Sequence, residues 1–222
     1  MTDDSKREQH KNRSSRRASR TRQRLLDAAL LVFGDRGVDA CTVEDITERA
    51  DLGKGTFYRH FEDKATLIRV LLEMAVAQLL ERMTMRREKI RTLAEVIDHI
   101  VQAHITFYMD FSTTYAFLLQ NQLAARSRRG TPIAGEEPIL RYIGAIEAQL
   151  AASLPHPSDP ATLKMAACGL AGWIAGFFTV GGLALGREAL AASAGQLRMM
   201  AANGVTAYLS TTHGAEPARQ SA

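Results

Sequence analysis

The chain of 222 residues is 46% hydrophobic and 23% charged, an ordinary balance for a soluble globular protein with one large or two small domains. Its first residues lack the charged, apolar and cleavage segments of a secretory signal, so we expect a cytoplasmic protein. Its two cysteines, Cys41 and Cys168, have no CxxC spacing, which argues against a zinc site or a disulfide framework and favours buried, reduced thiols.

The net charge of +4 conceals a strongly basic start of the chain. Residues 1–24 hold nine Lys or Arg and three acidic side chains, so this segment carries +6 and the rest of the chain −2. Because the segment is also rich in Ser and nearly free of apolar residues, it cannot build a core. We therefore expect residues 1–20 to form an arm that is disordered when free.

A helix is predicted over residues 22–35, because Leu26, Leu30 and Phe33 share one face and Gly37 follows its end. A short helix follows, which Thr42 caps with Asp45 three residues later, an acidic variant of the capping box. Residues 51–53 then break the helical pattern.

A second short helix is predicted over residues 54–60. Phe57 and Phe61 are four residues apart, so both face inward while the polar residues around them stay near the surface. A helix inserted into a DNA groove requires this separation of packing from polar display.

The rest of the chain is predicted as further helices, and no strand alternation or internal repeat occurs. Three starts carry capping signals: Asp63, Thr92 with Glu95, and Asp159 with Pro160. The expected helices span about 64–87, 93–108, 112–126, 139–154, 160–185 and 188–209, with a loop at 127–138. The fold class is therefore all-α, with about nine helices.

An uncharged stretch of 22 residues, 165–186, is long enough for a membrane span. It is rich in Ala and Gly rather than Leu, and Gly181-Gly182 interrupts it. We therefore expect no membrane association.

Three segments together resemble the TetR family of bacterial transcriptional regulators: TRQRLLDAALLVFGDRG (residues 21–37), TVEDI, and KGTFYRHFEDK ending at residue 64. They cover about 45 of the 222 residues, and their order and spacing make the match specific. Two positions depart from the family. Asp51 stands where the family often has a turn Gly, which bears on the turn geometry, and Gly53 stands where it often has Ser, which removes a side-chain cap and a phosphate contact.

The resemblance implies a domain order. A three-helix helix-turn-helix DNA-binding domain is expected at 21–66, a helical effector-binding and dimerisation domain at 67–210, and a flexible tail at 211–222. The last two long helices are expected to form the subunit interface, where the small residues of the uncharged stretch let helices approach closely. The basic arm is either a solvated tail or a contact to DNA phosphates or the minor groove, and beside such a domain we favour the DNA contact.

The resemblance also assigns DNA-binding roles by position. The helix that begins at residue 54 would enter the major groove, with Lys54, Gly55, Thr56 and Arg59 as base readers and Thr42, Tyr58, His60 and Lys64 as phosphate contacts. For His60 an exposed or packing histidine is the alternative. Glu44 either accepts a hydrogen bond from cytosine or faces solvent, and the sequence does not choose between these.

Five aromatic residues lie within eleven positions, at 107, 108, 111, 115 and 117. Such a cluster is either ordinary core or, as the resemblance implies for the middle helices, the lining of an effector pocket. The ligand-binding residues expected on that basis are His104, Phe107, Tyr108, Phe111, Tyr115 and Gln120. His99 and His104 are five residues apart, which does not fit a metal-ligand pair on one helix.

These expectations combine into a homodimeric, ligand-responsive regulator, a repressor that a small hydrophobic effector releases from a palindromic operator. The alternative is a DNA-binding protein of the same fold without a small-molecule effector, controlled by a protein partner or acting architecturally. The chain has no nucleophile–base constellation, P-loop or dinucleotide fingerprint, so neither an enzyme activity nor a cofactor is expected.

Overall fold

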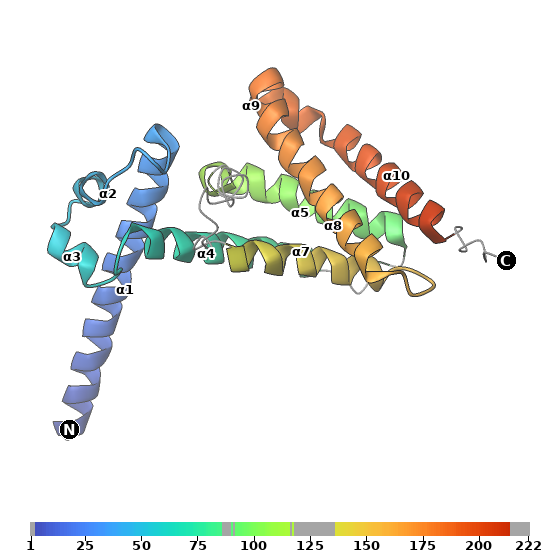
Figure 1. Cartoon of the computed structure of the whole chain (residues 1–222). Helices are drawn as coiled ribbons and strands as arrows, with labels where there is room; N and C mark the ends of the chain where they lie inside the picture. Colours follow the sequence, from blue (N-terminus) through green and yellow to red (C-terminus); the bar gives the residue numbers. More distant parts are fainter. Residues whose placement is uncertain (1–2, 86–89, 91, 116, 118–135, 214–222) are drawn as a thin grey trace, which may run out of the picture. The chain divides into compact units, whose positions relative to one another are not determined.

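The computed structural model describes residues 3–85, 90, 92–115, 117 and 136–213, and every regular element in these ranges is a helix (Figure 1). The fold is therefore all-α, as the sequence predicts. The chain divides into two compact units, residues 1–71 and 72–222. The helix α4, Lys64–Thr84, begins in the first unit and ends in the second.

The first unit consists of α1 (Asp3–Arg36), α2 (Val43–Arg49), α3 (Lys54–Tyr58) and the start of α4. Its core is formed by apolar side chains that are almost fully buried: Leu25, Leu26, Phe33, Ile46, Phe57, Phe61 and Leu67. Thr42 and Asp45 make both bonds of the predicted capping box, which fixes the start of α2. The predicted sides of these helices are confirmed, since their apolar stripes face this core.

The helix α1 is much longer than expected, because it includes the arm for which we predicted disorder. No Pro or Gly occurs from residue 3 to residue 33. The second half of the helix is held by packing, so it provides the nucleus whose formation is the unfavourable step of helix formation. Extension then needs only one further hydrogen bond per residue. Composition excluded a core in the arm, but it did not exclude this continuation.

The turn between α2 and α3 contains the only non-glycine residue with positive φ among the described residues, Asp51 at 52°. Its N–H donates to the Glu48 carbonyl at 3.0 Å, and the Leu52 N–H donates to the Thr47 carbonyl at 2.9 Å. Arg24 of α1 donates to the Ala50 carbonyl at 2.6 Å. Asp51 thus adopts the left-handed conformation that a glycine would adopt there, and the turn keeps its shape at the cost of local strain.

Asp51→Gly should raise the free energy of unfolding by about 0.5–1 kcal/mol, because relief of the left-handed strain exceeds the extra backbone entropy of glycine. The Asp51 side chain is fully exposed, so little else is lost. Chemical denaturation measures the change. Asp51→Ala is the control, since it keeps the Cβ atom and should not stabilise; equal gains from both variants would show that strain at Cβ is not the cause.

The second unit contains the rest of α4, α5 (Leu93–Asp110), a helical turn at 112–115, α7 (Glu136–Ala151), α8 (Pro160–Gly176), a π-helical segment η2 (Phe177–Gly181), α9 (Gly182–Ala192) and α10 (Ala194–His213). The helix α10 packs on α5 and α8, and α7 packs on α5 and α8. The capping box predicted at Thr92 and Glu95 is present, and Asp159 is the predicted N-cap of α8, with Pro160 in the first turn and the Asp159 side chain accepting from the Thr162 N–H.

Two of the predicted helices differ from the structure near the C-terminal end. The expected break between residues 185 and 188 occurs at Gly186, whose φ of 76° suits glycine alone. A second break follows at Ser193, and the last helix runs to His213 rather than Leu209. The π segment η2 and this second break raise the number of helical elements above nine.

The two cysteines differ in solvent exposure. Cys41 is buried as predicted, whereas Cys168 is exposed on α8. The exposed position follows from helical periodicity, because Ala166, Ala167 and Leu170 occupy the buried side of α8. The prediction for Cys168 was therefore wrong.

Candidate nucleic-acid interface and the second unit

The helix α3 is held by a buried aromatic side chain and exposes polar residues to solvent. Phe57 is fully buried, and its ring lies 5.6 Å from that of Phe61. Tyr58 is 57% exposed, and Lys54 and Gly55 are exposed as well. The anchor and the exposed residues alternate within two helical turns, so the backbone of α3 is held while its outer side remains available.

Neither glycine of α3 is required by packing within the chain. No atom lies within 4 Å of a Cβ placed on Gly53 or Gly55, and neither residue has positive φ. Gly53 is the N-cap of α3 and supplies no side-chain cap, as its sequence position predicts. The backbone of the first turn of α3 is therefore bare, which permits close approach of a ligand to its N–H groups.

Arg59 lies along its own helix. Its Nε donates to the Gly55 carbonyl at 3.3 Å, and its Nη2 donates to Thr56 Oγ1 at 3.0 Å. These bonds bring three of the four expected base readers together on one exposed side of α3. They are exposed hydrogen bonds, which a base edge can replace at modest cost.

Lys54, the fourth expected reader, forms an ion pair with Glu44 across the α2–α3 turn. Both side chains are about half exposed. The sequence did not decide whether Glu44 contacts a cytosine or faces solvent. In the structure its carboxylate pairs with the Lys54 ammonium and neutralises its charge. The pair therefore contributes no net charge to the outer side of α3.

Lys64 has a different environment from the expected phosphate contact. Its Nζ donates to the Val38 carbonyl at 3.0 Å and to the Cys41 carbonyl at 2.7 Å. Two of its three N–H groups thus fasten the loop between α1 and α2 to the start of α4. These bonds give Lys64 a positioning role, and its contact with a phosphate stays a prediction. The sequence could not show the two bonds, because the carbonyls lie 26 and 23 residues earlier.

The remaining expected phosphate contacts lie at the edges of the same surface. Thr42 is exposed, and its hydroxyl accepts from the Asp45 N–H at 3.2 Å. The pKa of Asp45 is lowered chiefly by the bond from the Thr42 backbone N–H. His60 is half-buried, and Tyr58 contacts the Phe57 ring edge-on.

In the second unit, aromatic rings from several helices meet in one cluster. Tyr115 is 1% exposed and packs against His104 and Phe107, with ring centroids 6.2 and 5.7 Å away. Phe178 of η2 joins it at 4.9 Å. The Tyr115 hydroxyl is buried and has no hydrogen-bond partner. An unpartnered buried hydroxyl is costly, and a polar group of a ligand would satisfy it.

His104 differs from Tyr115, because both of its ring nitrogens are engaged. Nδ1 donates to the Ile100 carbonyl at 2.7 Å, which leaves Nε2 to accept from the Tyr142 hydroxyl at 2.7 Å. The expectation that His104 orients a ligand is therefore replaced by a structural role. Tyr142, on α7, was not among the residues that the sequence predicted to bind a ligand.

Of two further residues expected to bind a ligand, one is exposed and the other is not described. Phe111 is 41% exposed and lies beneath the Arg82 guanidinium, 5.0 Å from its ring centroid, so it is not enclosed. Gln120 lies outside the described residues. Phe107 is fully buried and Tyr108 half-buried, and the latter stacks on Phe178 at 4.8 Å. Phe178 carries no motif that could have identified it; the π segment places it here.

Comparisons with known proteins agree with the arrangement of the first unit. Residues 25–71 match the model of the family described as bacterial regulatory proteins, tetR family. This range contains α2, α3 and their core. These residues form a DNA-binding domain of the TetR family of transcriptional regulators.

Individual TetR-family relatives match in part or at low identity. The transcriptional regulator AcrR of Shigella flexneri is 27% identical over 99 residues, 42% of this chain and 46% of AcrR, so the match spans less than half of that relative. FadR of Bacillus subtilis, solved with stearoyl-CoA, has a TM-score of 0.67 at 19% identity and covers 82% of this chain and 98% of its own. AibR, solved with isovaleryl coenzyme A and operator DNA, has a TM-score of 0.56 at 15% identity and covers 71% and 85%. The two structures share the fold, and the curated relatives are regulators and not enzymes.

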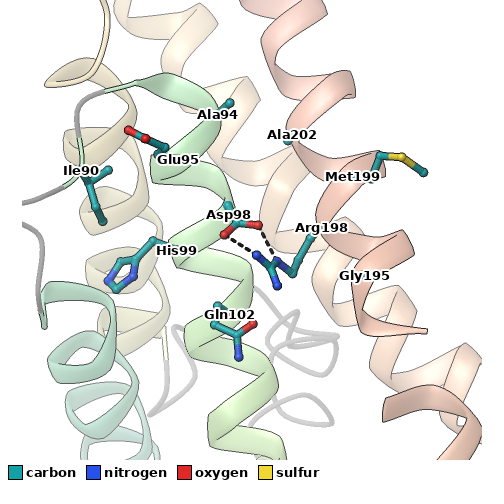
Figure 2. A pocket seen from close by; sticks show the side chains of 10 residues that line it. All are labelled: Ile90, Ala94, Glu95, Asp98, His99, Gln102, Gly195, Arg198, Met199 and Ala202. Carbon is teal, nitrogen blue, oxygen red and sulfur yellow. Dashed lines mark hydrogen bonds and ion pairs between the residues drawn. The ribbon is translucent and has the colours of Figure 1, made fainter. Parts of the chain in front are cut away.

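A cavity of about 660 Å³ lies between α5 and α10 of the second unit (Figure 2). Asp98 and Arg198 face each other across it and form a two-bond ion pair of 2.5 and 2.7 Å. Both side chains are about 40% exposed, so the pair contributes about 1 kcal/mol at most. The cavity shares no residue with the expected ligand-binding set, and is a separate feature of the second unit.

Acid should destabilise the second unit through His104. Burial lowers the pKa of His104 from 6.5 to about 4, while its bond to the Ile100 carbonyl opposes this shift. Above pH 6.5 the imidazole is neutral in both states. As the pH falls from 6.5 toward 4, only the unfolded chain takes up the proton, so the free energy of unfolding should fall by up to about 3 kcal/mol.

Urea unfolding at about pH 7 and about pH 4.5 measures this loss. His104→Gln should be less stable at neutral pH but should lose less between the two values. His156→Gln, at an exposed loop position, is the matched control and should keep the wild-type loss. An unchanged loss in His104→Gln would assign the acid sensitivity to another group.

Proposed function

We propose that this protein is a homodimeric repressor that binds a palindromic operator through α3 and is released by a small hydrophobic effector. The observation that carries the proposal is the outer side of α3: Gly55 and Arg59 are exposed and Thr56 is half-buried beside them, above the buried Phe57. A bare backbone, a hydroxyl with a methyl group, and a guanidinium are groups suited to reading base edges in a major groove.

A second copy of the chain fits the exposed face of α8 and α10. Met165, Trp173 and Tyr208 are 62, 43 and 37% exposed, and line an apolar groove of about 280 Å³ between these helices. The Trp173 ring lies on Gly204, where any Cβ would overlap it. Residues 160–181 are long and apolar enough to cross a membrane, yet only a third of their most apolar window is buried within the chain. An isologous contact would cover this apolar face in a cytoplasmic protein.

The apolar residues of these helices differ in their need for a partner. Trp173 is exposed and Phe177 half-buried, whereas Leu197 is 5% exposed within the single chain and needs no partner. The proposed interface lies on α8 (Pro160–Gly176) and α10 (Ala194–His213), whose bounds differ from those of the helices 160–185 and 188–209 predicted from sequence.

The effector site is proposed at the aromatic cluster, with Phe107, Tyr108 and Tyr115 from the expected set and Phe178 in addition. An apolar lining with one free hydroxyl suits a hydrophobic ligand with a single polar group. FadR and AibR were solved with acyl-CoA molecules, so acyl thioesters are the first compounds to test. Release requires that the ligand bind more tightly to an arrangement with low operator affinity.

The deciding experiment selects duplex DNA from a random pool with the purified protein, followed by a transcription assay on the enriched sequence. The proposal expects a two-fold symmetric consensus and lower transcription with protein present. Loss of binding with an acyl-CoA series, alongside a rise in melting temperature, would support an effector. A saturating ligand series without any effect would favour the alternative of a regulator without a small-molecule effector.

Tyr115→Phe should change the effector response and leave the fold intact, because it removes a hydroxyl that makes no hydrogen bond in the structure. We expect effector affinity to fall by about 5- to 10-fold, equivalent to about 1–1.5 kcal/mol, with unchanged operator affinity. Tyr142→Phe is the contrasting variant, since it breaks the bond to His104 and should lower stability. Full effector affinity in Tyr115→Phe would place the site elsewhere.

A further inference from the structure

Residues 12–20 of α1 are helical although their side chains are not packed into the core. Every side chain from Asn12 to Arg20 is exposed. The next two, Thr21 and Arg22, are half-buried, because the helix reaches the core there. In Figure 1 this part of α1 extends beyond α2 and α3 toward the N-terminus. It is a long exposed surface with a strong charge.

Four of the six arginines in residues 12–24 fall on one side of the helix, whereas Arg22 lies on the opposite side, over the Phe61 ring. Arg13, Arg17, Arg20 and Arg24 are spaced i, i+4, i+7 and i+11, so they form a single stripe, which we call the arginine stripe. Leu26, Ala29 and Phe33 occupy the opposite side by the same periodicity, and they are buried. The arginine stripe therefore faces away from the core along its whole length.

The stripe ends at the proposed DNA-reading surface. Its last member, Arg24, donates to the carbonyl of Ala50, in the turn that leads into α3. Its first member lies eleven residues earlier, about 16 Å along the helix at 1.5 Å per residue. That length matches about five phosphates of one DNA strand at 3.4 Å each along the duplex axis.

In isolation this helix is unfavourable electrostatically. Like charges three or four residues apart on a helix repel each other. A polyanion relieves this repulsion. The segment NRSSRRASRTRQR at residues 12–24 has one apolar residue, Ala18, so it has nothing to insert into a lipid bilayer. Charge complementarity therefore favours a nucleic-acid backbone.

We propose that residues 12–24 bind as a helix along the phosphate backbone of duplex DNA beside the site read by α3. The proposal rests on the proposed function for its location, but the contact itself is independent of sequence. It predicts that helical form, and not charge alone, supplies the affinity of the arm. A flexible arm in the minor groove would have no such requirement.

The test compares Ser19→Pro with Ser19→Ala in the full-length protein. Residue 19 lies off the arginine stripe, and proline there separates Arg13 and Arg17 from Arg20 without changing any charge. Helix α1 from residue 19 onward can retain its form, because proline is tolerated in a first turn. The probe is a random-sequence duplex of about 30 base pairs at low salt.

Ser19→Pro should bind this duplex at least 5-fold more weakly than Ser19→Ala. The triple variant Arg13→Gln, Arg16→Gln and Arg17→Gln should keep the helix and reduce the slope of log K against log salt by about three units. Circular dichroism of each variant reports whether the helix is present. Equal affinity of Ser19→Pro and Ser19→Ala would overturn the proposal, as would a difference that occurs only with phosphatidylserine vesicles.

Failure of the two proposals can be told apart. If no consensus emerges from the DNA selection, the proposed operator function fails, while the comparison at residue 19 on random duplex still reports on the arm. If a consensus emerges and Ser19→Pro equals Ser19→Ala on both DNAs, only the helical-arm proposal fails.

Discussion

Gly172→Glu should convert the protein to monomers and abolish cooperative binding to an operator with two half-sites. Gly172 is exposed on α8, next to Trp173 and one turn from Gly169, and no atom of its own chain lies within 4 Å of a Cβ placed there. The substitution therefore leaves the single chain unstrained. In a contact between two copies it would bury an unpaired charge, which costs several kcal/mol and would abolish dimerisation at micromolar concentrations.

Gly144→Glu is a matched control for this variant. Gly144 is also an exposed helical glycine with open space around it, but it lies on α7. Sedimentation or light scattering should find dimers of Gly144→Glu and monomers of Gly172→Glu at equal concentration. A dimeric, operator-competent Gly172→Glu protein would move the interface away from α8.

Arg59→Ala should weaken operator binding by about 1–3 kcal/mol and relax the preference at one base position, because a guanidinium bonds guanine through two atoms. In the free protein its Nε and Nη2 bond Gly55 and Thr56, exposed groups that do not stabilise the core. Protein stability should therefore remain close to that of the wild type.

Binding to the selected operator and to a set of single-base variants measures this effect. Arg59→Lys is the control, since it keeps the charge and loses the planar two-atom contact. If Arg59 reads a base, Lys should lose the preference nearly as fully as Ala does. An equal decrease on all DNA sequences for Arg59→Ala would make Arg59 a phosphate contact.

Local chemistry made several parts of the fold predictable. Thr42 with Asp45, Thr92 with Glu95, and Asp159 with Thr162 form the helix starts that their spacing indicates. These bonds join residues three positions apart, so the sequence contains all of the information. Helix α3 was predictable for the same reason, because the spacing of Phe57 and Phe61 fixes which side is buried.

The arm shows where composition alone was misleading. A basic, polar segment has no core-forming residues, and this favoured disorder. It also contains no helix breaker before the packed part of α1, and the structure continues the helix through it. Whether such a segment is helical depends on the element it joins, which average charge and hydropathy do not describe.

The sequence by itself determined the all-helical class and the buried side of α3, because these follow from periodicity and from residues within one or two turns. The TetR-type DNA-binding unit came from the resemblance of three segments to that family. Only the tertiary structure decided which partners distant side chains find. Lys64 reaches carbonyls 26 and 23 residues away, His104 bonds Tyr142 38 residues on, and Asp98 pairs with Arg198 across 100 residues. Periodicity tells which side of a helix is buried, but it does not tell against which helix, so roles that depend on these long-range contacts had to come from the packing itself.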